Sequence, residues 1–553
     1  MNSQSIYKQQ ELRSYFIGNM DCRLELTSYA GTGYFSPLIL DFLQEDEKLK
    51  PFYQYSPLKP DFRQAIEARK TFQTNRKLLV QELEKQYHQV DTGEKVRQNI
   101  RALSDENTFT VCTAHQPNLF TGYLYFAYKI LQTVRLAEQL GQQFPGCRFV
   151  PVYYMGSEDN DLDELGRINL DGETLVWRSS QKGAVGRMKP EGLEPMLDQV
   201  ERHLGVSNHA QELMELLRYC YLSHPDIQTA TLHLVNALFG EYGLVVLIPD
   251  TPAFKRVILT VMKEELFRQV SFPIVQKTID RLSVHYHAQA HPREINLFYL
   301  SDQLRERIVR EKDTWHVLNT DLKFTQKELE EELEQHPERF SPNVILRGIL
   351  QESILPNIAF IGGGGEIAYW LELKGVFEYF RVPYPVLLLR NSFLWVEEKA
   401  AKQLQKVGLQ PVALFQDVDH IIAQYVQAHT RQYLALKEER QAIAHLYDEL
   451  LKKAGAIDTT LKASVNAERS RSLRSIDKLE HKFLRAEKKH FAWQTALISR
   501  VKEDLFPRGS LQERVENLLP YYAKYGPAFI RMVYDHLDPL ASQFSILTEM
   551  PRA

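Results

Sequence analysis

The order of apolar and polar residues predicts an α/β fold for the first part of this chain. Apolar runs rich in β-branched and aromatic residues predict buried strands at 108–112, 147–156, 242–251, 354–362 and 384–393. Most are followed by a stretch with apolar residues at helical spacing, as at 123–140. Crossovers of this length make the joined strands parallel. We therefore expect a doubly wound, parallel, Rossmann-like sheet with insertions, preceded over residues 1–100 by helices and loops.

The pattern changes after Ser392. Residues 395–503 are rich in Glu, Lys, Arg, Leu and Ala, and apolar residues step by threes and fours from Ile443 to Val465. Such a stripe is typical of an α-helical coiled coil, and polar residues near 458 divide it into a two-helix hairpin. The apolar stripe predicts a homodimer, and the alternative is that the two helices bury it between themselves.

These patterns divide the chain into three parts. A catalytic core is expected at 1–394, with connecting insertions at about 166–235 and 275–340. The coiled-coil hairpin follows at 395–503. The tail, 504–553, regains aromatic residues and is expected to pack on the core.

Composition narrows the class of protein. The chain has 553 residues with 44% hydrophobic and 25% charged residues, which is ordinary for a globular protein. A net charge of −4 gives no reason to expect nucleic acid or an anionic membrane. The polar start and the lack of a long apolar run predict a cytoplasmic protein. His285, His287 and His291 have no further ligand types at metal-site spacing, so no metal site is predicted.

The first polar cluster follows the strand at 108–112. Its side chains and the start of the next helix comprise Thr113, His115, Gln116, Asn118, Thr121 and Gly122. In open α/β sheets ligands bind at the carboxyl ends of strands, and helix N-termini there bind anions. We expect His115 and Gln116 to be catalytic and the others to bind substrate or nucleotide. The alternative is a polar loop with a capping threonine.

The second cluster is acidic and follows the strand at 147–156. Glu158, Asp159 and Asp161 are candidate catalytic residues, since carboxylates there suit an ammonium group, sugar hydroxyls, Mg²⁺ or general-base chemistry. The alternative is that they only stabilise a helix N-terminus.

The third cluster is a glycine run, Gly362, Gly363, Gly364 and Gly365, followed by Glu366. Consecutive glycines let backbone amides approach a ligand and form an anion-binding nest. A dinucleotide fingerprint is only loosely matched. The alternative is a tight structural turn.

The fourth cluster comprises Arg347, Glu352, Arg390 and Ser392. An arginine facing a ligand binds carboxylate or phosphate with two parallel hydrogen bonds. All four are therefore predicted to bind substrate or nucleotide, and a plain surface arginine is the alternative for Arg347.

Taken together, the chain resembles the bacillithiol synthase family from about residue 108 to its end. The resemblance is carried by TAHQPNLFTGYLYFAYK (113–129), VPVYYMGSEDNDLDE (150–164), SPNVILRGILQE (341–352), IGGGGEIAYWLELKGVFE (361–378) and LFPRGSLQER (505–514). The chain departs from the commoner family form at His115, where glutamine is usual, and at Asn160, where histidine is usual.

The resemblance implies a core like that of class I aminoacyl-tRNA synthetases and a coiled coil that mediates dimers. It also implies a ligase that joins the carboxyl group of cysteine to the amine of glucosaminyl-malate. Amide formation needs an activated carboxyl group, and the synthetase-like core that the resemblance implies makes ATP with Mg²⁺ a candidate co-substrate; the sequence itself predicts no firm cofactor. Alternatives are another nucleotide-dependent aminoacyl ligase, a nucleotidyltransferase, or a coiled-coil scaffold with a vestigial nucleotide pocket.

Overall fold

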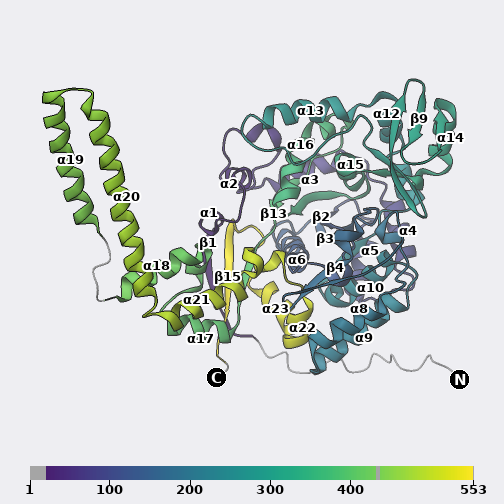
Figure 1. The fold of residues 1–553 in the computed structure, drawn as a ribbon. Helices are drawn as coiled ribbons and strands as arrows, with labels where there is room; N and C mark the ends of the chain where they lie inside the picture. The colour runs from purple at the N-terminus through teal and green to yellow at the C-terminus, as the bar shows by residue number, and fades with distance from the viewer. Residues whose placement is uncertain (1–19, 431–435, 552–553) are drawn as a thin grey trace. The chain divides into compact units, whose positions relative to one another are not determined.

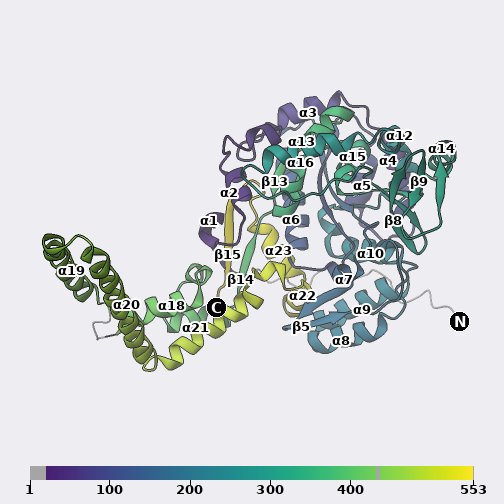
Figure 2. The same ribbon diagram turned by 45° about the horizontal axis from the view of Figure 1, so that its top comes forward.

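The chain forms two compact units (Figures 1 and 2), and the computed structural model describes residues 20–430 and 436–551. The first unit comprises Met1–Leu394 and Ser510–Ala553, and the second comprises Trp395–Gly509. The second unit is therefore inserted in sequence between two parts of the first. Within the described segments, no helix is long and apolar enough to cross a membrane.

A five-stranded parallel sheet forms the centre of the first unit. Its strands are β2 (Thr108–His115), β3 (Arg148–Met155), β6 (Val245–Leu247), β12 (Asn357–Gly362) and β13 (Val386–Leu389). Their spatial order is β13-β12-β2-β3-β6, and all neighbours pair in parallel. The predicted Rossmann-like sheet is thus confirmed. Because the chain crosses to the other side of β2 after β6, strand order reverses between β2 and β12.

Helices cover this sheet because its strands are buried along almost their whole length. Helix α6 (Tyr125–Gln143) packs on β2 and β3, and α16 (Gly364–Phe380) packs on β12 and β13. Helix α3 (Phe62–Lys70) packs on β12. The core between them is continuous, with Phe109, Val111, Leu136, Ile361 and Val386 among its fully buried side chains. The other helices before β2 are α1 (Tyr29–Thr32), α2 (Pro37–Leu43), α4 (Arg76–Gln86) and α5 (Glu94–Ala102).

Two long segments interrupt the strand order. Between β3 and β6 lie α7 (Leu162–Leu165), the hairpin β4 (Arg167–Leu170) and β5 (Glu173–Val176), α8 (Glu194–Leu204), α9 (Asn208–Leu222) and α10 (Ile227–Phe239). Between β6 and β12 lie α11 (Pro252–Val257), α12 (Leu259–Arg268), α13 (Ser271–Leu282), β7 (Leu297–Ser301), β8 (Leu304–Glu311), β9 (Thr314–Val317), β10 (Lys323–Thr325), α14 (Gln326–Gln335), β11 (Phe340–Pro342) and α15 (Val344–Ile354). Strands β7 to β11 form a second, antiparallel sheet of order β10-β9-β8-β7-β11.

A strand near each end of the described chain takes part in an antiparallel pair. Strand β1 (Cys22–Ser28) pairs with β15 (Gln543–Glu549), which follows α22 (Leu519–Tyr525) and α23 (Pro527–Asp535). The expectation of only helices and loops in residues 1–100 is therefore wrong at β1. Its partner lies at the far end of the sequence, and two of its apolar side chains, Leu24 and Leu26, are exposed. Local sequence carries no signal for such a pairing.

The second unit is helical. Strand β14 (Phe393–Val396) leads into α17 (Glu398–Lys406), α18 (Val418–His429), α19 (Lys437–Ile457), α20 (Leu461–Lys488) and α21 (Ala492–Leu505). Figure 1 shows α19 and α20 side by side, and ion pairs Arg440–Asp477 and Arg469–Asp448 join them. This is the predicted coiled-coil hairpin. It leaves part of its apolar stripe exposed, with Leu446 58% and Phe483 44% exposed.

Candidate active site

A cavity of about 340 Å³ lies where strand order reverses, at the carboxyl ends of β2 and β12. This is the position at which doubly wound sheets bind ligands. The predicted residues that line the cavity are His115, Gln116, Arg347, Gly363, Gly364, Gly365, Glu366 and Arg390. Sequence reasoning did not single out the lining residues Tyr125, Tyr154, Gly156, Tyr369 and Arg514.

His115 ends β2 and stands beside aromatic rings of α6. Its ring centroid lies 5.5 Å from that of Tyr125 and 5.3 Å from that of Phe126. Its Nε2 is buried and has no hydrogen-bond partner within the described chain. Burial first, and then the positive charges of Lys129, Arg390 and Arg347, hold the pKa of His115 well below its ordinary 6.5. The imidazole is therefore neutral at pH 7, and one ring nitrogen can accept a proton.

Arg347 comes from α15 and faces the cavity with its charge fixed by Asp159. Nη1 of Arg347 lies 3.1 Å from Oδ2 of Asp159. Burial disfavours the charge of Arg347, but Asp159, Tyr369 and Tyr154 more than offset that effect and raise its pKa. Gly156 makes room for the guanidinium, since a Cβ there would lie 3.3 Å from Nη1.

Arg390 follows β13 and is held by a residue from the C-terminal part of the chain. Its Nη2 lies 2.7 Å from Oε1 of Glu513, and both side chains are almost fully buried. Its guanidinium also stacks over the Tyr125 ring, 4.7 Å from the centroid. Glu513 accepts further hydrogen bonds from the Ser392 hydroxyl (3.0 Å) and the Phe393 amide (3.2 Å). Ser392 therefore supports Glu513 and does not line the cavity.

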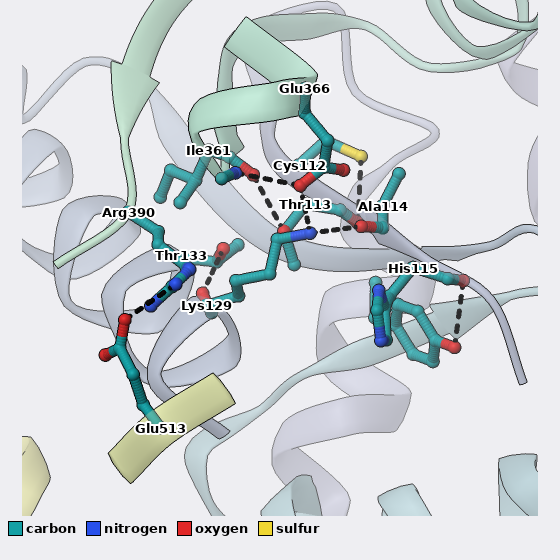
Figure 3. A network of polar contacts seen from close by, with 12 residues as sticks. Cys112, Thr113, Ala114, His115, Lys129, Thr133, Ile361, Glu366, Arg390 and Glu513 are labelled. Atoms are coloured by element: carbon teal, nitrogen blue, oxygen red, sulfur yellow. Dashed lines mark hydrogen bonds and ion pairs between the residues drawn. The ribbon is translucent and has the colours of Figure 1, made fainter. Parts of the chain in front are cut away.

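A buried lysine joins the two halves of the sheet at this point (Figure 3). Nζ of Lys129, from α6, donates to the Ala114 carbonyl at 2.7 Å and to Oε2 of Glu366 at 2.5 Å. The same Glu366 oxygen accepts the Gly363 amide at 2.8 Å and so caps the start of α16. Sequence reasoning missed Lys129 because it lies in an apolar helical stretch. Its signal was a cation flanked on both sides by apolar residues, which needs a buried partner.

The glycine run keeps the cavity open without forming a left-handed turn. None of these four glycines has a positive φ. One amide of the predicted nest, that of Gly363, is already used by Glu366. A Cβ at Gly363 would stand 3.5 Å from Oε2 of Glu366 and 3.7 Å from Nε of Arg390, and would thus occupy the cavity. Gly362 is instead required for packing, since a Cβ there would lie 2.8 Å from the Phe360 ring.

Several predicted acidic residues have structural partners outside the cavity. Glu158 forms a buried ion pair with Lys255 and accepts from the Ser341 hydroxyl at 3.2 Å. Asp161 caps α7 by accepting the Glu164 amide at 3.0 Å. Glu352 is fully buried and paired with Arg69 at 2.7 Å.

The remaining predicted residues shape the loop after β2. The Thr113 hydroxyl donates to the Ile361 carbonyl at 2.8 Å and ties β2 to β12. Thr121 and Gly122 have positive φ, and a Cβ at Gly122 would stand 2.7 Å from Cβ of Asn118. These residues build a tight turn and do not line the cavity.

The lining groups define the chemistry that the cavity favours. Arg347, Arg390 and Arg514 converge on it, whereas Glu366 is neutralised by Lys129. A cavity of this kind suits ligands with carboxylate or phosphate groups. His115 places a neutral base beside them.

Comparisons with known proteins agree with this architecture. The model for "Bacillithiol biosynthesis BshC, N-terminal Rossmann-like domain" matches residues 23–391, and that for "Bacillithiol biosynthesis BshC, C-terminal coiled-coil domain" matches residues 393–549. Two proteins named "Putative cysteine ligase BshC" are similar over nearly their whole length. That of Flavobacterium johnsoniae is 39% identical, covering 94% of this chain and 99% of its own. That of Flavobacterium psychrophilum is 40% identical, covering 94% and 98%.

A solved structure is matched, at low structural similarity. The "putative arginyl t-RNA synthetase" of Campylobacter jejuni is 10% identical, covering 80% of this chain and 98% of that chain. Its TM-score of 0.23 is too low to indicate a shared fold.

Proposed function

The chain belongs to the BshC family of bacillithiol biosynthesis, and on this premise we propose that it joins L-cysteine to glucosaminyl-malate through an amide bond. Relatives of this chain are named cysteine ligases, which is consistent with a ligase. What we propose are its substrates and its chemistry. The observation that carries it is the cavity, which combines three arginines with a neutral histidine where strand order reverses.

The arginines suit the acceptor substrate. The malate group of glucosaminyl-malate carries two carboxylates, and guanidinium groups bind carboxylates with two parallel hydrogen bonds. Arg347 and Arg390 are pre-oriented by Asp159 and Glu513, so little side-chain freedom is lost when a ligand binds. Arg514 has no such dedicated short ion pair in its described surroundings, and burial and repulsion from Arg390 lower its pKa. An anionic ligand would relieve that repulsion.

Activation of the cysteine carboxyl group is the first proposed step. A carboxylate oxygen attacks the α-phosphorus of ATP, a P–O bond breaks, and pyrophosphate leaves. The group that suits these phosphates is the start of the 17-residue helix α16, at Gly364 and Gly365. Among the described lining residues, the carboxylate that could hold a metal ion is that of Glu366, and it is already bound to Lys129. We therefore propose that Mg²⁺ arrives on the nucleotide phosphates.

Amide formation is the second proposed step. The glucosamine nitrogen attacks the activated carbonyl carbon, the C–N bond forms, and the C–O bond to AMP breaks. The nitrogen must lose a proton, and we assign its acceptance to His115, which lines the cavity and whose Nε2 has no hydrogen-bond partner in the described chain. A glutamine at this position could not accept that proton in the same way. The histidine is therefore the residue of this chain most open to test.

The exposed stripe of the hairpin supports a homodimer. Leu446 and Leu461 in α19 and α20 are 58% and 42% exposed, although they belong to the apolar stripe. The hairpin thus leaves part of this stripe unburied by its own two helices. We propose that a second copy of the chain covers it.

The proposal is tested with purified protein, L-cysteine, glucosaminyl-malate and Mg·ATP, with products identified by mass spectrometry. The expected products are the amide, AMP and pyrophosphate. His115→Ala should lower the rate by a factor of about 10² to 10⁴, as for a lost general base. His88→Ala is the matched control, because His88 is exposed in the turn after α4. A folded wild-type protein that forms no amide would contradict the proposal.

A further inference from the structure

The loop that joins β3 to α7 is held by elements from across the first unit. The Val185 amide donates to the Asp159 carbonyl at 2.8 Å, and the Gly186 amide donates to the Ser157 carbonyl at 2.9 Å. Gly186 is needed there, because a Cβ would come within 2.5 Å of the Ser157 carbonyl oxygen. Glu158 is anchored by Lys255. The backbone that carries Asp159 is therefore fixed before any ligand arrives.

The Asp159 carboxylate is shared between two arginines. Its Oδ2 lies 3.1 Å from Nη1 of Arg347, which lines the cavity. Its Oδ1 lies 3.6 Å from Nη2 of Arg305, which belongs to β8 of the antiparallel sheet. A carboxylate engaged on both oxygens is poorly placed to act as a general base. Its placement suits a support for Arg347.

Arg305 is itself held rigidly. Its side chain is only 8% exposed, and its guanidinium lies 3.9 Å from the centre of the Phe298 ring. Its Nη1 donates to Oδ1 of Asn160 at 3.1 Å. Arg305 thus binds two successive side chains of the loop, Asp159 and Asn160.

We infer that Arg305 is a positioning residue, which acts through Asp159 to orient Arg347 toward an anionic group of the acceptor substrate. This inference rests on the proposed function. Arg305 does not line the cavity, so its effect must pass through the carboxylate. An arginine fixed in its binding rotamer loses less entropy when it takes a carboxylate. The second sheet therefore contributes to substrate affinity from outside the cavity.

A merely structural role for Arg305 makes different predictions. If it only tied β8 to the loop, its loss would lower the melting temperature and leave the kinetic constants of the folded enzyme unchanged. As a positioning residue, it should change KM for the acceptor more than kcat. The effect should also depend on Arg347.

The test compares Arg305→Gln with Arg310→Gln in steady-state ligation. Arg310 lies on the same strand, donates to the Lys312 carbonyl and stacks over Trp315. Its substitution therefore removes the same charge from β8 at a place remote from the loop that carries Asp159. Arg305→Gln should raise KM for glucosaminyl-malate about tenfold with kcat little changed, as expected for coupled contacting residues. Arg310→Gln should leave KM unchanged. Arg305→Lys, which keeps the charge but has no planar fork, should give an intermediate KM.

A double-mutant cycle completes the test. In an Arg347→Lys background, Arg305→Gln should cause little further rise in KM. Additive effects, or equal KM values for the Arg305→Gln and Arg310→Gln enzymes, would overturn the inference. If the wild type forms no amide, the proposed function fails separately. In that case the affinity for L-malate is measured by calorimetry on the same variants. Equal affinities for the Arg305→Gln and Arg310→Gln proteins would overturn the inference.

Discussion

Glu352 is predicted from the sequence to bind substrate, but in the structure it is buried and paired with Arg69. Nη2 of Arg69 lies 2.7 Å from Oε2 of Glu352, with side-chain exposures of 1% and 0%. Arg69 also donates to the Glu352 carbonyl at 2.7 Å, and Gln351 and Asn357 donate to the carboxylate. The perturbation is Arg69→Met, which removes the counter-charge and keeps an apolar side chain of similar length.

The expected loss follows from leaving one buried charge without its partner. Removing one member of a buried ion pair costs about 3–5 kcal/mol, whereas removing both charges together is often nearly neutral. Arg69→Met should therefore be strongly destabilised, and Arg69→Met/Glu352→Gln should recover most of the loss. Burial raises the pKa of Glu352, and loss of Arg69 raises it further. The folded state then binds more protons than the unfolded state, so the deficit of the Arg69→Met protein should shrink as pH falls.

Urea denaturation, followed by a signal from the first unit, measures these free energies at pH 7 and pH 5. Ligation rates per folded protein are measured on the double variant, which should retain the wild-type rate. A loss for Arg69→Met below about 1 kcal/mol, the value of an exposed pair, would refute the energetic reasoning. A stable double variant that cannot ligate would show that Glu352 contacts substrate after all.

Gly363→Ala should fold normally, because Gly363 has φ −71° and ψ 170°, yet weaken binding of glucosaminyl-malate or ATP about tenfold or more by placing a methyl group in the cavity; unchanged calorimetric affinities would contradict this. Asp161→Ala should cost about 1 kcal/mol through the lost cap of α7 and leave ligation unchanged, so a loss of rate in the folded variant would return Asp161 to the active site. The stability of His115→Gln relative to the wild type should rise as pH falls below 6.5, because the unfolded histidine takes up a proton that the folded one does not. Urea titrations at pH 8 and pH 5 measure this difference in the free energy of unfolding, and an unchanged difference would show that the histidine is solvated. Light scattering should give twice the chain mass for the wild type and a smaller mass for Leu446→Glu/Phe483→Glu, whereas a monomeric wild type would remove the proposed dimer.

The sheet was predictable because its strands are short, apolar and joined by amphipathic helices. Strands β2 and β3 follow from local composition, and their parallel pairing follows from the crossover length. The position of His115 follows in turn, since it ends β2. The pairing of β1 with β15 was not predictable, because it joins the two ends of the chain without a local signal.

The candidate site was predictable where residues end strands and unpredictable where charges are paired inside the protein. Arg347 and Arg390, which the sequence predicts to bind substrate or nucleotide, both line the cavity, but their partners Asp159 and Glu513 come from distant segments. Glu352 looked like a ligand residue because its partner, Arg69, is far away in sequence. Sequence alone shows which charged residues exist, whereas the fold decides which of them are already neutralised.

The most direct test of the central claim is the affinity of the cavity for the acceptor substrate. Isothermal titration calorimetry of glucosaminyl-malate compares the wild type with Arg390→Met, whose circular dichroism and melting temperature are recorded on the same samples. The matched control is Arg310→Met, on β8 of the second sheet. We predict binding to the wild type and the control, and an affinity about a hundredfold lower for a folded Arg390→Met, the loss of a charge-assisted pair. Equal affinities for all three folded proteins would contradict the assignment of the acceptor to this cavity.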